Sequence, residues 1–153
     1  MRCRHQEARL LGQKLATPIL WPSDAVAITS FGDASANHST ATGAINAACH
    51  SAHAHIPLPV LFVCEDNGIG ISVATPSGWI RAAYGSRPGL KYFEADGGDL
   101  AESFDVAREA ASWVRSNRRP AFLHLRVVRL MGHAGSDAEA TYRTPDQISQ
   151  DDP

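Results

Sequence analysis

Four short apolar runs along the chain predict four buried strands. Residues 25–31 (AVAITSF) and 59–65 (PVLFVCE) are almost continuous in apolar side chains, and residues 90–98 and 121–130 are further strand-like runs. Turn-forming residues bound these runs. Continuous rather than alternating runs are typical of strands covered on both faces, as in a parallel sheet. The pattern therefore predicts a parallel sheet.

Two of the segments between these strands have the periodicity of an amphipathic helix. Between the first two strands, small apolar residues share one helical face and would let a helix lie close to the sheet: Ala41, Ala44, Ile45, Ala48 and Ala52. After the third strand, Asp99 can cap an amphipathic helix, with Glu102 three residues later. That helix would carry Leu100, Phe104, Ala107, Ala111 and Val114 on its apolar face.

Two shorter helices complete the pattern. Residues 6–16 have helical spacing. In residues 74–85, Thr75 can cap a helix, Pro76 suits its first helical position, and Gly85 ends it.

The alternation of strands and helices predicts an α/β fold, with a parallel sheet flanked by helices. Residues 131–153 are polar and rich in Gly, Ala and Asp, so they are expected to form a loop-like tail. The whole chain, residues 1–153, is expected to be a single domain.

Composition favours a globular protein without a nucleic-acid or membrane partner. The chain is 44% hydrophobic and 20% charged, with a net charge of −2, so it has no basic field for nucleic acid. It has no long apolar run for a membrane span. Its three cysteines show no CxxC spacing, which fits a reducing compartment. We therefore expect a cytoplasmic location.

Polar residues suited to a metal and a diphosphate follow the first two strands. Asp33 comes after the first strand, and Asn67 comes after the second. Parallel strands end at one edge of a sheet, so both can converge on one ion. Asp33 can supply a carboxylate, Asn67 a side-chain carbonyl and the turn at 68–70 a backbone carbonyl, all hard oxygen ligands of the kind Mg²⁺ prefers.

Small residues beside Asp33 favour an approach by phosphate. Gly32, Ala34 and Ser35 would let backbone N–H groups come close to an anion at the start of the following helix. The alternative is that both motifs are ordinary turns, because Gly, Asn and Asp are common turn residues.

The order of these motifs resembles the thiamine diphosphate signature. GDAS at 32–35 and CEDNGIGIS at 64–72 are similar to a GDG block followed about thirty residues later by an Asn pair. GHAGSDAEATYRT at 132–144 is similar to a later segment of the same proteins. These are the decarboxylating first components of 2-oxoacid dehydrogenase complexes, and their alpha-type chains, of the pyruvate and branched-chain enzymes, match best. The resemblance runs from about Asp24 to Ile148.

The resemblance implies the thiamine-diphosphate-binding fold and, in it, an incomplete diphosphate-binding domain. Thiamine diphosphate and Mg²⁺ would be the cofactors. By resemblance, Mg²⁺ would bind Asp33, Asn67 and the backbone of Ile69. Gly32, Ala34 and Ser35 would lie at the diphosphate.

The resemblance also implies a catalytic residue and partners. His133 would lie at the cofactor and serve the substrate or the reductive acylation of the lipoyl group, a task suited to an imidazole that titrates near neutral pH. Asp137, Tyr142 and Arg143 would belong to a loop that orders when cofactor binds. The expected partners are a beta-type, pyrimidine-binding chain or domain, the lipoyl domain of the acyltransferase component, and a 2-oxo acid substrate.

Three features depart from the family pattern. Ala34 stands in place of the second glycine, which is harmless if its φ angle is negative, and Asp66 replaces the first Asn of the pair. Alpha-type chains are longer, so we expect this chain to be a fragment, a split subunit or a truncated product. The alternative function is a truncated, non-catalytic module that keeps the fold and binds a partner chain.

Overall fold

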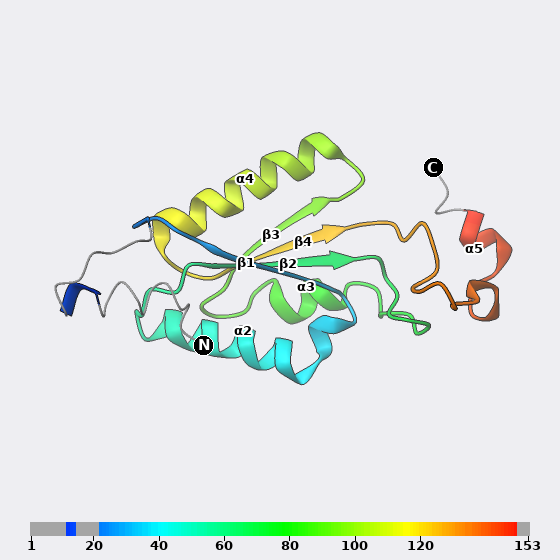
Figure 1. Cartoon of the computed structure of the whole chain (residues 1–153), viewed down its shortest axis with the longest axis horizontal. Helices are drawn as coiled ribbons and strands as arrows, with labels where there is room; N and C mark the ends of the chain where they lie inside the picture. Colours follow the sequence, from blue (N-terminus) through cyan, green and yellow to red (C-terminus); the bar gives the residue numbers. More distant parts are fainter. Residues whose placement is uncertain (1–11, 15–21, 150–153) are drawn as a thin grey trace.

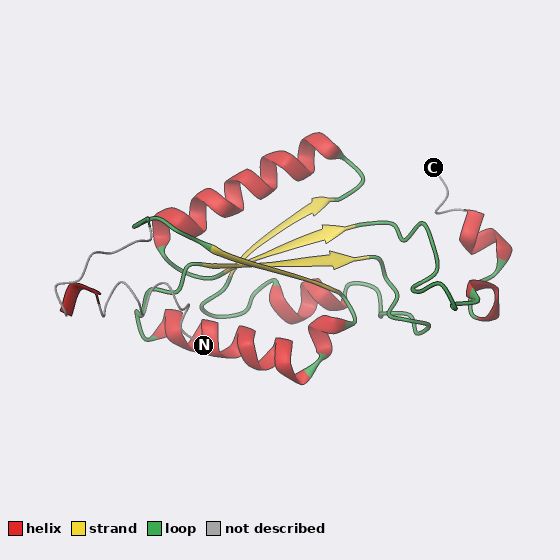
Figure 2. Ribbon diagram, in the orientation of Figure 1, coloured by secondary structure: helices red, strands yellow, loops and turns green. Residues whose placement is uncertain are grey.

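A four-stranded parallel sheet organises the computed structural model, which describes residues 12–14 and 22–149 (Figure 1 and Figure 2). The order across the sheet is β1-β2-β4-β3, and every neighbouring pair is parallel. The strands are β1 Ala27–Gly32, β2 Val60–Asp66, β3 Lys91–Asp96 and β4 Ala121–Arg126. The predicted parallel α/β fold is therefore confirmed, and all four strands end at the same edge of the sheet.

Helices cover both faces of this sheet (Figure 1). On one face lie α2 (Ser39–His53) and α3 (Trp79–Tyr84), and on the other lies α4 (Leu100–Asn117). The cluster under α2 and α3 includes Ile45, Ala48, Phe62, Ile80, Tyr84 and Phe122. The cluster under α4 includes Leu61, Phe93, Ala110, Val114 and Leu123. Burial of these side chains fixes the sheet that carries the strand-end turns.

The α4 helix begins at the predicted residue, but the side chains that it packs against the sheet differ from those predicted. The Asp99 carboxylate accepts hydrogen bonds from the backbone N–H groups of Ala101 and Glu102, at 2.9 and 3.0 Å, so it caps the helix. However, Leu100 is 85% exposed and Phe104 is 65% exposed. The side chains of α4 that pack on the sheet are Val106, Ala107, Ala110, Trp113 and Val114. The first turns of α4 therefore leave two large apolar side chains in solvent.

The α3 helix starts later than the sequence predicts. It begins at Trp79, after Gly78 with φ +74°, and no side chain caps it. The expectation that Thr75 caps this helix is wrong, because the Thr75 hydroxyl donates to Asp33 instead. The predicted end at Gly85 is confirmed, since its N–H bonds to the Arg81 carbonyl.

Two further differences concern the chain after β4 and the opening segment. β4 ends at Arg126 because its partners end in register with it, at Asp66 and Asp96. The expected loop-like tail contains two short helical turns, η2 Glu139–Thr141 and α5 Pro145–Ser149. The helix expected at 6–16 lies outside the described residues except for positions 12–14. Over the described ranges, no helix is long and apolar enough to span a bilayer.

Candidate functional site

The turns that follow β1 and β2 contact each other beyond the carboxyl edge of the sheet. Asp33 is 1% exposed, and its Oδ2 accepts a hydrogen bond from the Thr75 hydroxyl. The Thr75 N–H in turn donates to the carbonyl of Gly68 at 2.8 Å. A Cβ added to Gly70 would lie 3.0 Å from the Cβ of Ala34, so these two positions are in close contact. The convergence predicted from the two strand ends is therefore present.

Side chains set the shape of the turn after β2. The Asp66 Oδ1 accepts from the Gly68 N–H at 2.9 Å, and the Asn67 Oδ1 accepts from the Ile69 N–H at 3.1 Å. Gly68 has φ +75°, a conformation that a side chain would strain. Two successive Asx-type bonds followed by a glycine explain why the sequence reads Asp-Asn-Gly at this point.

The turn after β1 is a short 3₁₀ helix, η1 Ser35–Asn37. Ala34 has φ −65° and ψ −37°, so alanine fits without strain where the family pattern has glycine. The first N–H groups of a helical turn have no partner within it and can face an anion. The turn is held against α3, because the Trp79 Nε1–H donates to the Asn37 Oδ1 at 2.6 Å and the Tyr84 hydroxyl donates to the Ala36 carbonyl at 2.8 Å.

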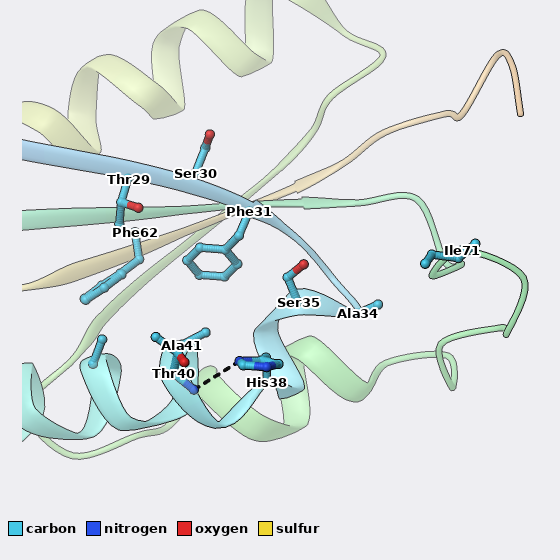
Figure 3. Close-up of a pocket in the computed structure, with 11 residues that line it drawn as sticks. Thr29, Ser30, Phe31, Ala34, Ser35, His38, Thr40, Ala41, Phe62 and Ile71 are labelled. Atoms are coloured by element: carbon cyan, nitrogen blue, oxygen red, sulfur yellow. Dashed lines mark hydrogen bonds between the residues drawn. The ribbon is translucent and has the colours of Figure 1, made fainter. Parts of the chain in front are cut away.

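Two clefts adjoin these turns. A cleft of about 310 Å³ lies between the second turn and the C-terminal segment, lined by Asn67, Gly68, Ile69, Ser72, Ala74, Tyr142, Arg143 and Gln147. A second, of about 600 Å³, runs along β1 and α2 and reaches Ala34, Ser35 and Ile71 (Figure 3). His38, on its rim, caps α2 by accepting from the Thr40 N–H at 3.2 Å. Residues from both predicted motifs therefore border open space.

Arg129 ties the C-terminal segment to the second turn, a role that the sequence did not reveal. Its guanidinium donates to the carbonyls of Gly70 and Ile71 at 2.9 and 3.2 Å, and to the Tyr142 hydroxyl at 2.8 Å. The Tyr142 hydroxyl donates to the Asp137 Oδ2 at 2.5 Å. That hydrogen bond holds the pKa of the Asp137 carboxyl below its ordinary value. The one available sign was a lone arginine in the apolar stretch at 127–131.

The predicted catalytic residue lies on this C-terminal segment. His133 is exposed, and its backbone N–H donates to the Asp137 Oδ2 at 2.7 Å. Its side chain lines neither of the two clefts. The structure therefore brings Asp33, Ala34 and the Asn67 turn together, whereas the role of His133 stays a prediction.

The oxygen atoms at the two turns suit a small, hard cation. Within the described residues, no three His, Cys, Asp or Glu side chains gather as a metal site. The ligand set expected here needs only one of them, the buried carboxylate of Asp33, because its other two oxygens come from the Asn67 amide and a backbone carbonyl. Each amide oxygen has two lone pairs, so the bond from the Ile69 N–H leaves Asn67 able to bind a cation. The donor set thus fits Mg²⁺.

Comparison with known proteins identifies the family. Residues 12–152 match the family described as the dehydrogenase E1 component. The chain is 35% identical over 129 residues to the pyruvate dehydrogenase E1 component subunit alpha of Rickettsia conorii, covering 82% of this chain and 37% of that protein. It is 33% identical over 131 residues to the human mitochondrial somatic form of that subunit, covering 83% of this chain and 32% of that protein. The chain thus spans about a third of the length of these relatives. It belongs to the dehydrogenase E1 component family.

Proposed function

We propose that this chain is the thiamine diphosphate and magnesium binding part of a 2-oxoacid dehydrogenase. The complete enzyme would carry out oxidative decarboxylation of a 2-oxo acid and transfer the acyl group to a lipoyl group. The main support is the contact between the Asp33 turn and the Asn67 turn, joined by Thr75, in a chain of this family. The expected partners are a beta-type chain or domain and the lipoyl domain of the acyltransferase component. A cytoplasmic location is part of the same proposal.

The roles of the individual residues follow from their positions. Asp33, Asn67 and the backbone carbonyl of Ile69 would hold Mg²⁺. The N–H groups of Ala34 and Ser35 would face the diphosphate, with Gly32 beside them. When bound, thiamine diphosphate supplies an electron sink for the decarboxylation.

His133 and the segment around it would act on the substrate side. An imidazole can serve as a general acid or base, and that of His133 is exposed. The Asp137 carboxylate anchors the backbone N–H of His133, so it would set where that imidazole lies.

Calorimetric titration with thiamine diphosphate tests the proposal directly. We expect binding that requires Mg²⁺ and disappears when the metal is chelated. Asp33→Asn keeps an acceptor for the Thr75 hydroxyl but removes the charge, so it should weaken binding by at least about tenfold. Asp105→Asn is the matched control, because Asp105 lies on the exposed side of α4 and pairs with Arg108 at 3.0 Å. Equal binding by the two variants would contradict the metal assignment.

A second candidate is a non-catalytic module that keeps the fold and binds a partner chain. It is favoured by large apolar side chains in solvent, such as Leu100 and Phe104 on α4 and Ile28, 65% exposed, on β1. Large exposed apolar side chains often lie at protein interfaces. A chain that binds a beta-type partner but shows no magnesium-dependent binding of thiamine diphosphate would support this alternative.

A further inference from the structure

A chain of hydrogen bonds crosses the sheet from β3 to the turn after β2. The His124 side chain, on β4, has its Nδ1 2.6 Å from the Tyr92 hydroxyl and its Nε2 2.8 Å from the Asp66 Oδ2. The other carboxylate oxygen of Asp66 accepts from the Gly68 N–H at 2.9 Å. His124 is 4% exposed, whereas Gly68 is exposed, so this hydrogen-bond chain runs from the interior to the backbone of the proposed metal-binding turn.

The chemistry of the groups gives this chain a direction. A carboxylate can only accept hydrogen bonds, so the Nε2 of His124 must carry the hydrogen atom and donate to Asp66. The Nδ1 of a neutral imidazole is then an acceptor, and the Tyr92 hydroxyl is its donor. Burial, the larger cause, and the nearby Glu94 charge raise the pKa of Tyr92, which keeps the phenol protonated. The Glu94 carboxylate lies 3.8 Å from the same Nδ1 but is paired with Arg81.

The surroundings of His124 make this chain of hydrogen bonds costly to break. On the neighbouring strands its register partners are Cys64 and Glu94, and the fully buried Phe122 precedes it by two residues on the same face. Because His124 is buried, its imidazole has little access to water that could replace a lost hydrogen-bond partner. The Asp66 carboxylate is therefore held on one side by a buried donor and on the other by the turn itself.

We propose that His124 is a positioning residue for the turn at Asp66, Asn67 and Gly68. By donating to one oxygen of Asp66, it orients the carboxylate so that the other oxygen fixes the Gly68 N–H. Gly68 then holds its left-handed conformation, and the side-chain carbonyl of Asn67 is presented at the carboxyl edge of the sheet. The consequence for the cofactor rests on the function proposed above, whereas the ordering of the turn does not.

Two matched variants of the full chain separate this role from simple packing. In His124→Gln, the amide nitrogen can take the place of Nε2 and still donate to Asp66. In His124→Asn, the amide is too short to reach Asp66, although its oxygen can still accept from Tyr92. Amide hydrogen exchange at Gly68 should accelerate about tenfold in His124→Asn and stay close to wild type in His124→Gln. The amides of Phe122 and Leu123, in the sheet ladder, serve as the internal reference.

Titration with thiamine diphosphate and Mg²⁺ gives a second readout. His124→Asn should weaken the magnesium-dependent binding about tenfold, and His124→Gln should weaken it less than about threefold. If the wild-type chain shows no such binding, the proposed function fails, and the exchange at Gly68 still decides the positioning role.

The opposite result is equally defined. If both variants change Gly68 and the sheet amides to the same extent, or if neither changes Gly68, His124 only fills the core and the proposal is wrong. Should His124→Asn not fold, Tyr92→Phe keeps the aromatic ring and removes the donor to Nδ1. It should accelerate the Gly68 exchange about threefold, and an unchanged rate would overturn the proposal.

Discussion

Two regions beyond the carboxyl edge of the sheet are held in place by different kinds of interaction. The first comprises the turns at 32–37 and 66–75, which grow out of buried strands and share the buried carboxylate of Asp33. The second is the segment 127–149, whose η2 and α5 have no buried residues. The Arg129 guanidinium ties it to the first region, in addition to the Val127 N–H at its start, which donates to the Asp66 carbonyl at 2.8 Å. The turns are thus an extension of the core, whereas the segment depends on polar contacts between part-buried side chains, such as those of Arg129 and Tyr142.

Truncating a core side chain beneath the turns should have the largest effect on the free energy of unfolding. Phe122 is fully buried and stacks on Tyr84 and Tyr92, with ring centroids 4.6 and 6.0 Å apart. Phe122→Ala should lower the free energy of unfolding by about 3–5 kcal/mol, measured by urea denaturation. Phe104→Ala is the matched control and should change stability by less than about 0.5 kcal/mol, because its ring is largely in solvent. Similar losses in the two variants would mean that the core is not where the structure places it.

The contact that joins the two turns should come next. Thr75→Val keeps the shape of the side chain but leaves the Asp33 carboxylate without its hydroxyl donor. We expect the free energy of unfolding to fall by about 1–3 kcal/mol, since the lost donor served a buried charged group. Thr75→Ser keeps the hydroxyl and should lose much less. If urea denaturation gave the same value for valine and serine, the hydroxyl would not matter to the first region.

Removing the Arg129 contacts should loosen the second region beyond Val127 without unfolding the first. Arg129→Met keeps much of the apolar stem but removes the donors to the Gly70 and Ile71 carbonyls. Amide exchange at Arg143, whose N–H donates to the Glu139 carbonyl at 3.0 Å, should accelerate about tenfold or more.

The sheet is the internal control for that experiment. The amide of Leu123 should keep its protection, and global stability should fall by less than about 1 kcal/mol. Arg129→Lys retains the charge without the planar fork and should behave more like methionine than like wild type. A loss of protection at Leu123 equal to that at Arg143 would show that the two regions unfold together.

The same contrast explains which features could be predicted from the sequence. Continuous apolar runs mark the strands, Asp99 marks a helix start, and the parallel order brings the ends at Asp33 and Asn67 together. These features depend on local periodicity or on the topology that it implies. The fold and the meeting of the two turns were therefore accessible.

The polar contacts that complete the site were not accessible, because they join residues far apart in the chain. Thr75 bonds to Asp33 across 42 residues, His124 to Asp66 across 58 and Arg129 to Gly70 across 59. Such pairs produce no periodic pattern in the sequence. A threonine before a proline, such as Thr75, is also typical of a helix start, which led to the wrong prediction of a cap. The exposure of Phe104 was hidden for a similar reason, since periodicity gives a helix face but not what lies opposite it.

The smallest expected effect is a shift in how the second region responds to acid. The Tyr142 hydroxyl and the His133 N–H both donate to Asp137 and lower its pKa below the ordinary value of 3.8. Because the folded pKa is the lower one, the charged carboxylate stabilises this segment above 3.8 and loses that effect as the pH falls through the folded pKa.

An NMR titration of the Asp137 carboxyl and the His133 amide measures this shift. In Tyr142→Phe the larger of the two hydrogen bonds is absent, so the midpoint should move up toward 3.8 and the His133 amide should change in step with it. Thr141→Ala is the control, because the Thr141 hydroxyl donates to the Ala138 carbonyl, at 2.7 Å, and not to Asp137. An unchanged midpoint in Tyr142→Phe would mean that Asp137 is not tied to Tyr142 in solution. Arg129 would then hold Tyr142 and the second region without help from the Asp137 carboxylate, which would anchor only the backbone of His133.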